Sequence, residues 1–235
     1  RRDRRTFREY GHVVNRFELE RDGSVEYAQW LHPFEKPKTI SQANVDGWRA
    51  FLRDGDLAID VGAHTGDTTV PMALACGAAG LVVAVEPNPY VFRVLEANAA
   101  LNPGRAHMLP LNVAATERDG EFEFHYWDAS FGNGGYLSRL HNQRHGHHYP
   151  LRVTGRNLER ELRARIPERL AELRLIKTDA EGYDAMVLKS MRRLIDETRP
   201  VLVCEMHRKL DDSERVILFE ELARPGYRVH RLTGG

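Results

Sequence analysis

A glycine-rich turn beside an acidic residue is the first feature of this sequence that could do chemistry. The run from Asp60 to Gly66 reads Asp-Val-Gly-Ala-His-Thr-Gly and follows a short apolar stretch. Gly62 has no side chain, so the backbone can come close to a ligand, and the unpaired N–H groups of a helix beginning near Gly66 would point at it. Asp60 would accept a hydrogen bond there from a cationic amino group.

A second acid, Glu86, ends the next apolar run and follows the turn by the roughly 20 residues expected of a ribose-binding carboxylate. A carboxylate can accept hydrogen bonds from both ribose hydroxyls and disfavours a 2′-phosphate. The turn lacks the Gly-x-Gly-x-x-Gly pattern of dinucleotide sites and the lysine of phosphate-binding loops. The pattern therefore favours S-adenosylmethionine, which has a ribose and an adenine but no phosphate.

Two later apolar runs are followed by polar groups that could act on the acceptor, the molecule that receives the methyl group of S-adenosylmethionine. These groups could position the acceptor and take its proton. Asp179 and Glu181 follow the first, and Glu205 and His207 follow the second. The carboxyl ends of the strands of an open α/β sheet face one crevice, so these side chains should meet there. We expect Asp179 and Glu181 to position the acceptor, with one of them as the base. His207 is the alternative base, because the ordinary pKa of histidine suits proton transfer.

The elements that must hold these residues alternate between strand and helix from residue 56 onward. This order predicts a mostly parallel central sheet with helices on both faces, and Pro110 argues that its strand lies at an edge. Asn88 and Pro89 predict a helix start. Pro71 is unfavourable inside the helix expected over 66–76, because proline has no N–H for a helical hydrogen bond. The expected strands cover residues 57–61, 81–85, 108–113, 173–179, 201–204 and 227–232, and the helices 66–76, 89–101, 158–166, 186–195 and 213–222.

Two regions fall outside this alternation. Residues 1–54 are expected to form a small N-terminal extension, with a hairpin over 17–27 and a helix over 41–52, packed on an α/β domain of residues 55–235. Residues 121–127 alternate like an added hairpin strand, and 128–150 are predicted as a long loop. Within that loop, residues 131–138 are expected to cover the acceptor. The whole chain is expected to form a single domain.

Four blocks of the sequence resemble the FkbM methyltransferase family. The resemblance covers about residues 55–207, and its most specific block is Lys-x-Asp-x-Glu-Gly at 177–182. The blocks are Asp60 to Gly66, Val85 to Pro89, Asn112 to Ala114 and Ile176 to Asp184.

The resemblance implies a Rossmann-like class I methyltransferase fold and methyl transfer from S-adenosylmethionine. The usual acceptor in such a family is a hydroxyl oxygen of a sugar, a glycolipid or a natural product. Matched by position, Glu86 would bind the ribose, and Asn112 and Val113 would lie on the adenine side. His64 stands where the generic methyltransferase pattern has a glycine, at a position that varies within the family. The remaining cofactor contacts are expected along the turn, at Asp60, Gly62, Ala63, His64, Thr65 and Gly66.

The composition of the chain indicates which classes of partner and which cell compartment to expect. Lysine plus arginine and aspartate plus glutamate balance at 34 each, so nucleic acid is not expected as a partner. Residues 70–85 carry no charge but are fewer than the ~20 that a spanning helix needs, so no transmembrane segment is expected. The two cysteines are far apart, which fits a reducing compartment and hence the cytoplasm. A homo-oligomer stays open.

Three alternatives stay open beside an O-methyltransferase. The first is a nucleotide-binding or interaction module that kept the fold and lost the reaction. The second is an oxidoreductase with a dinucleotide, which the missing pyrophosphate glycine disfavours. The third is a metal-assisted O-methyltransferase, in which Asp179, Glu181 and Glu205 would hold a hard cation that orients a diol. No residue is predicted to be a metal ligand.

Overall fold

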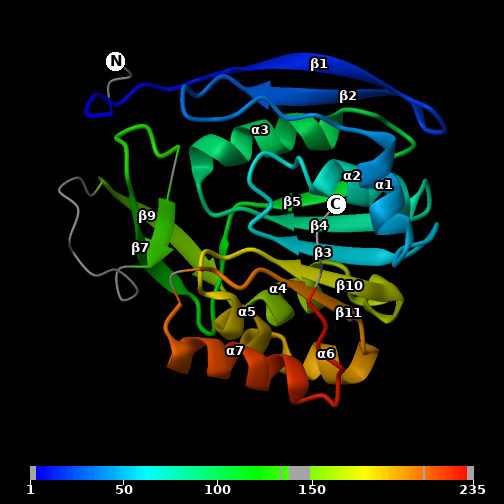
Figure 1. Cartoon of the computed structure of the whole chain (residues 1–235), viewed down its shortest axis with the longest axis vertical. Coiled ribbons are helices and arrows are strands. Elements are labelled where there is room, and N and C mark those ends of the chain that lie inside the picture. The colour runs from blue at the N-terminus through cyan, green and yellow to red at the C-terminus, as the bar shows by residue number, and fades with distance from the viewer. Residues whose placement is uncertain (1–3, 133, 138–148, 209, 232–235) are drawn as a thin grey trace.

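The computed structural model describes residues 4–132, 134–137, 149–208 and 210–231. Its centre is a five-stranded sheet in the order β11-β10-β3-β4-β5, with every neighbouring pair parallel (Figure 1). The chain runs outward from β3 through β4 to β5 and then returns to place β10 on the other side of β3. The strands are β3 (Leu57–Val61), β4 (Leu81–Val85), β5 (Met108–Leu111), β10 (Leu173–Thr178) and β11 (Val201–Cys204).

Helices cover both faces of this sheet, which explains why its strands consist mostly of apolar residues. Leu57, Ile59 and Val61 point to one face, where side chains of the later helices pack on them. Ala58 points to the other face, where it packs against the first helices and the N-terminal extension. The later helices are α4 (Leu158–Arg165), α5 (Asp184–Ser190), α6 (Arg192–Thr198) and the 3-10 helix Pro167–Glu172; the earlier ones are α2 (Thr69–Cys76) and α3 (Pro89–Ala100).

The N-terminal extension packs onto the earlier helices. An antiparallel hairpin of β1 (His12–Leu19) and β2 (Gly23–Trp30) lies over α3, and α1 (Gln42–Arg49) lies against α2 (Figure 1). Ser41 begins α1 with a capping box, in which its side chain and that of Asn44 each bind the other's backbone N–H. The expected hairpin and helix are therefore both present, and the strands are longer than predicted.

A second sheet stands beside the carboxyl ends of the central strands. Its order is β6-β9-β7-β8, from β6 (Ala114–Ala115), β7 (Gly120–Tyr126), β8 (Gly134–Leu137) and β9 (Tyr149–Arg156). β7 confirms the strand expected over residues 121–127. The loop expected over 128–150 is wrong at 134–137, which pair with β7, and at 149–150, which begin β9. Residues 138–148 lie outside the described part of the chain.

Three further expectations about elements need correction. The helix expected over 186–195 is two helices, because Met191 leaves helical geometry at φ −118° and ψ 15°. The helix expected from residue 66 begins at Thr69, so Pro71 lies in its first turn, where a missing N–H costs no helical bond. Of the strand expected over 227–232, residues 227–231 are described and form no strand.

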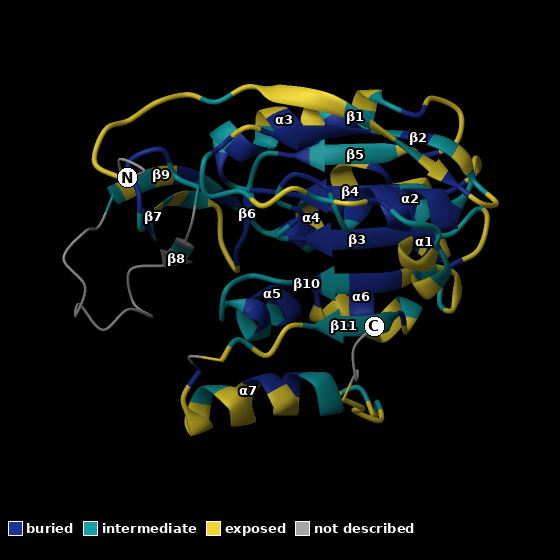
Figure 2. Cartoon of the chain, turned by 45° about the horizontal axis from the view of Figure 1, so that its top comes forward, coloured by how far each residue is buried: buried dark blue, intermediate teal, exposed yellow. Residues whose placement is uncertain are grey.

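The last helix, α7 (Asp212–Ala223), packs on α5 and exposes much of its outer surface (Figure 2). Asp211 caps it with a capping box to Glu214. In the described part of the chain, we find no helix with the length and apolar composition needed to cross a membrane.

Candidate functional site

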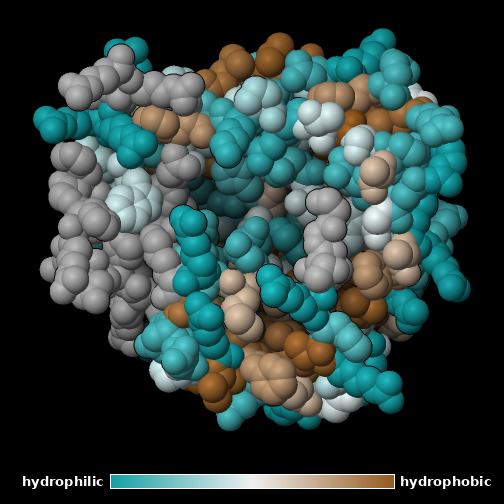
Figure 3. All heavy atoms as spheres, viewed as in Figure 1, coloured by the Kyte–Doolittle hydropathy of each residue, from teal (hydrophilic) through white to brown (hydrophobic). Residues whose placement is uncertain are grey.

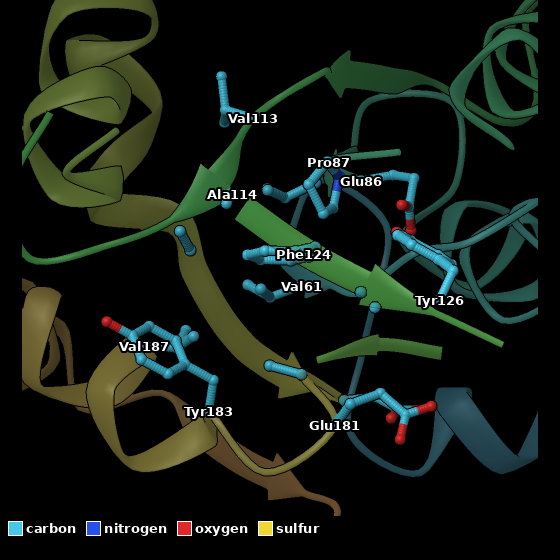
Figure 4. Close-up of a pocket in the computed structure, with 16 residues that line it drawn as sticks. Val61, Glu86, Pro87, Val113, Ala114, Phe124, Tyr126, Glu181, Tyr183 and Val187 are labelled. Atoms are coloured by element: carbon cyan, nitrogen blue, oxygen red, sulfur yellow. The ribbon is translucent and has the colours of Figure 1, made fainter. Parts of the chain in front are cut away.

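A pocket opens where the carboxyl ends of β3, β4 and β10 meet the second sheet (Figure 4). It contains about 600 Å³ of empty space, part of which is open to solvent. Gly62 and Glu86 lie on the side of the central sheet, Phe124 and Tyr126 come from β7, and Tyr183 comes from the start of α5. In Figure 3, a hollow with hydrophilic side chains around it lies between the two sheets.

The glycine turn is built so that only glycine fits at Gly62. Its φ is 79°, and a Cβ atom there would overlap the carbonyl oxygen of Asp179. The N–H groups of Gly62 and Ala63 both donate to the carbonyl of Val85, at 2.9 and 3.0 Å. These bonds hold the turn against the end of β4. Gly66, at φ 92°, closes it, and its N–H donates to the carbonyl of Ala63 at 2.8 Å.

The N-terminal extension holds the other half of the turn. The hydroxyl groups of Tyr27 and Thr65 are 2.6 Å apart in the interior. Asn98 on α3 donates to the carbonyl of Thr65 at 2.7 Å. His64, at φ 50°, meets the edge of the Trp30 ring, with 6.0 Å between ring centroids. Burial lowers the pKa of His64, so this side chain is held in its neutral form near neutral pH.

Asp60 is fully buried and is not one of the residues that line the pocket. One of its oxygens accepts from the Thr69 hydroxyl at 2.7 Å, and the other lies 3.0 Å from the Nζ atom of Lys177. Both carboxylate oxygens thus have partners inside the protein. The predicted direct contact of Asp60 with a cofactor stays a prediction.

Glu86 stands at the pocket wall as a buried acid. Its two oxygens accept from the backbone N–H groups of His64, at 3.0 Å, and Asn88, at 2.8 Å. Burial nevertheless raises the pKa of Glu86 to about 7. Each carboxylate oxygen can accept more than one hydrogen bond, so both keep capacity for hydroxyl donors that enter the pocket. This site fits the two hydroxyl groups of a ribose.

Asn112 and Val113 follow β5 and lie beside Glu86. The Nδ2 group of Asn112 donates to the carbonyl oxygens of Glu86 and Pro87, at 2.8 and 3.2 Å. This side chain therefore locks the end of β4. Val113 lines the pocket directly, and with Phe124 it makes part of an apolar wall suited to a flat ring.

The predicted catalytic residues form two pairs at the rim. Asp179 shares a hydrogen bond with Glu205, which raises the pKa of Glu205 to about 7. The Nε2 atom of His207 lies 3.2 Å from a carboxylate oxygen of Glu181. Asp179 and Glu181 both line the pocket. The structure thus brings together the ends of β10 and β11, as parallel strands predict.

The turn that carries Asp179 and Glu181 is held by Asp184. This buried carboxylate accepts from the N–H groups of Ala180 and Gly182, at 3.1 and 3.3 Å. Glu181 adopts a φ of 50°, a left-handed conformation that is uncommon for residues other than glycine. The local bonds of Asp184 therefore fix where the rim carboxylates stand.

Sequence reasoning missed several residues that shape the site. Tyr126 points toward Glu86 in Figure 4, and burial raises the pKa of its phenol well above the ordinary value. Alternation along β7 predicted a strand but not which of its faces meets the pocket. Lys177 belongs to the Lys-x-Asp-x-Glu-Gly block of the sequence, but its contact with Asp60 depends on the register between two strands.

Within the described residues, no three histidine, cysteine, aspartate or glutamate side chains are grouped as metal ligands.

Comparison with known proteins identifies the family. The Methyltransferase FkbM domain matches residues 60–229, and no curated protein matches. Among solved structures, P. horikoshii TYW2 in complex with MeSAdo is 23% identical, with a TM-score of 0.33, over 45% of this chain and 37% of its own. A SAM-dependent O-methyltransferase from Thermotoga maritima is 17% identical, with a TM-score of 0.31, over 46% of this chain and 43% of its own.

Fibrillarin from Aeropyrum pernix, in complex with natively bound S-adenosyl-L-methionine, is 14% identical with a TM-score of 0.38, and 92% of this chain and 89% of that one are covered. Similarity at this level carries no inference about function, and this chain spans less than half the length of TYW2 and of the Thermotoga enzyme. The domain match, which includes the glycine turn, Glu86 and both rim pairs, confirms the resemblance seen in the sequence. The chain has a Rossmann-like fold and belongs to the FkbM family of S-adenosylmethionine-dependent methyltransferases.

Proposed function

We propose that this chain methylates a hydroxyl oxygen of a small molecule, a glycan or a lipid. The observation that carries the proposal is one pocket with two different ends. At one end, Glu86 and Gly62 provide a site for a ribose and for a close backbone approach. At the other, Asp179 and Glu181 line the pocket and can bind a hydroxyl group and accept its proton, and their partners Glu205 and His207 lie next to them.

The residues of the first end would hold S-adenosylmethionine. Glu86 would bind the ribose hydroxyls, Val113 and Phe124 would contact the adenine, and the turn from Gly62 to Gly66 would lie against the methionine part. Asp60 would act from behind the turn through its bonds to Thr69 and Lys177. The bound cofactor supplies a methyl group on a positively charged sulfur, which is already activated for transfer.

The residues of the second end would orient the acceptor and handle its proton. An alcohol needs a base nearby because it is a poor nucleophile at neutral pH. Asp179 is well placed, since it lines the pocket and its side chain is 42% exposed. Glu181 would bind a neighbouring hydroxyl group, and His207, paired with Glu181, is the alternative base.

The charge of this rim also narrows the acceptor. Asp179 and Glu181 are two acids that line the same opening, and they repel a negatively charged ligand. An anionic acceptor such as a nucleic acid or a phosphorylated sugar would be disfavoured. An uncharged polyol would instead meet several hydrogen-bond acceptors.

The direct test is to incubate the protein with methyl-labelled S-adenosylmethionine and panels of neutral glycosides, glycolipids and polyketides, and to detect methylated products by mass spectrometry. We expect an O-methyl ether, and we expect Asp179→Asn to lower turnover at least about tenfold while the dissociation constant of S-adenosylmethionine changes less than threefold. Equal losses in both would assign Asp179 to the cofactor. Labelled amines or nucleic acids as the only products would overturn the proposal.

A further inference from the structure

A line of charges connects the back of the cofactor turn to the acceptor rim. The Nζ atom of Lys177 lies 3.0 Å from an oxygen of Asp60 and 3.8 Å from an oxygen of Asp179. The Lys177 side chain is 13% exposed, whereas the Asp60 side chain is fully buried. Beyond this line, the interaction with Asp179 raises the pKa of Glu205.

Strand register produces this arrangement. Lys177 on β10 pairs with Asp60 on β3, so the two side chains start from neighbouring positions of the same sheet. The N–H of Asp179 donates to the carbonyl of Val61 at 2.9 Å, which continues the pairing beyond Lys177. The lysine therefore lies between an acid on its own strand and an acid on the neighbouring one.

Lys177 keeps its positive charge in this place. Burial lowers the pKa of Lys177, but attraction to Asp60 and then to Asp179 outweighs burial, so the pKa lies above its ordinary value. The Thr69 hydroxyl binds the second oxygen of Asp60 at 2.7 Å. Asp60 is thus fixed by one neutral and one charged partner, and Lys177 offers its remaining attraction to Asp179.

We propose that Lys177 is a positioning residue that holds the Asp179 carboxylate at the acceptor site through their opposite charges. Asp60 is the counter-charge that allows this lysine to be buried. The inference rests on the proposed function, because it matters for catalysis only if Asp179 receives the proton of the acceptor. It assigns to Asp60 and Lys177 a role that requires no contact with the substrate.

Most of the titratable groups around this line of charges are acids, so few other positive charges lie near Lys177. The described charged or titratable groups that act on its members are Asp67 and His64 beside the cofactor turn, Glu86 at the end of β4, Glu181 and Asp184 around the rim turn, and His207, paired with Glu181, after β11. The two acids nearest to Lys177 should therefore respond to its removal in a defined direction.

The test is a carboxyl ¹³C NMR titration of the protein without cofactor or acceptor. In the wild type, a glutamate carboxyl that disappears in Glu205→Gln, and not in Glu86→Gln, should titrate near pH 7. In Lys177→Met, this transition should move up by about one pH unit or more, because Asp179 loses an opposite charge. In Asp60→Asn it should move down, because Lys177 then attracts Asp179 alone. Lys177→Arg should stay within about 0.3 unit of the wild type, since the charge is kept.

Opposite shifts of the transition in Lys177→Met and Asp60→Asn indicate that the charges of these residues act on it. If the two residues had only a structural role, the transition would move in the same direction in both variants or in neither. Lys189→Met, a partly buried lysine in the last turn of α5, is the control and should leave the transition unchanged. If Lys177→Met does not fold, the double variant Asp60→Asn with Lys177→Met removes both buried charges and should still show the upward shift. An unshifted transition in folded Lys177→Met, or in the folded double variant, would overturn the proposal. Since the titration involves neither ligand, a failure to find an O-methyl product would reject the proposed function separately.

Discussion

At the scale of single residues, Glu86 combines a buried position with two backbone hydrogen bonds. Burial raises its pKa to about 7, so the carboxyl group takes up a proton as the pH falls through neutrality. A ribose hydroxyl donates most readily to an ionised carboxylate. The protonation of Glu86 should therefore compete with cofactor binding.

We predict that the affinity for S-adenosylmethionine increases about tenfold between pH 6 and pH 8, because the ionised fraction of a group with a pKa near 7 rises by that factor. Isothermal titration calorimetry at several pH values measures this. Glu86→Gln should bind at least about tenfold more weakly at pH 8 and lose the pH dependence. Glu205→Gln, which removes the other carboxyl with a pKa of about 7, should keep it. A flat profile in the wild type would contradict the role of Glu86.

Gly62 is the second residue whose identity decides the site. A Cβ atom at Gly62 would meet the backbone of Asp179, and its φ of 79° is unfavourable for a side chain. Gly104 has a similar φ of 74° with no atom within 4 Å of the same Cβ position. Comparing the two separates the contact from the backbone conformation.

We predict that Gly104→Ala lowers the free energy of unfolding by about 1 kcal/mol, the cost of the left-handed conformation. Gly62→Ala should cost at least about 2 kcal/mol more, because the strand ends must move apart. Urea unfolding followed by circular dichroism measures both. Equal losses would show that the turn can relax around an added methyl group.

At the scale of elements, the turn between β10 and α5 carries the rim carboxylates and depends on Asp184. Asp184→Ala would leave the N–H groups of Ala180 and Gly182 without this acceptor. We predict a loss of about 2 kcal/mol in stability and faster amide hydrogen exchange at these two positions. Asp212→Ala, in the exposed first turn of α7, should leave exchange at both positions unchanged. Unchanged exchange in Asp184→Ala would mean that the turn holds its shape without this side chain.

The elements also show what could be predicted from the sequence. β3 and β4 match their predicted bounds because each is an apolar run closed by a polar or glycine residue, and α3 begins at the predicted cap, Asn88. These signals are local. The pairing of 134–137 with β7 and the break of the helix at Met191 depend on contacts with distant segments, which neither composition nor periodicity contains.

The same difference separates the predicted from the unpredicted parts of the site. Gly62 and Glu86 follow local strand ends, so their spacing was enough to place them together. The pairing of Lys177 with Asp60 joins strands that are distant in sequence and depends on a register that a single sequence does not give. Tyr126 was missed for a similar reason, since only the position of the second sheet turns its face toward the pocket.

At the scale of the whole molecule, the N-terminal extension and the central sheet share one hydrophobic core. Buried side chains of the extension pack in a single cluster with residues of β3, β4 and α2; they include Val25, Tyr27, Ile40, Val45 and Leu52. Asn98 on α3 also bonds the N–H and the carbonyl of Ala28 on β2, at 2.7 and 3.0 Å. We propose that the two parts form one folding unit, although their motifs are separate in the sequence.

This proposal predicts that the full chain unfolds in one cooperative transition. A chain that begins at residue 55 should fail to fold, because it exposes the apolar side of α2 and loses the Tyr27 contact with Thr65 in the cofactor turn. Deleting residues 228–235 is the control, since residues 228–231 are exposed and carry no element, and it should leave the transition in place. Calorimetry and circular dichroism report both outcomes. A truncated chain that folds and binds S-adenosylmethionine would show that the extension is a separate domain and that the cofactor turn needs no support from it.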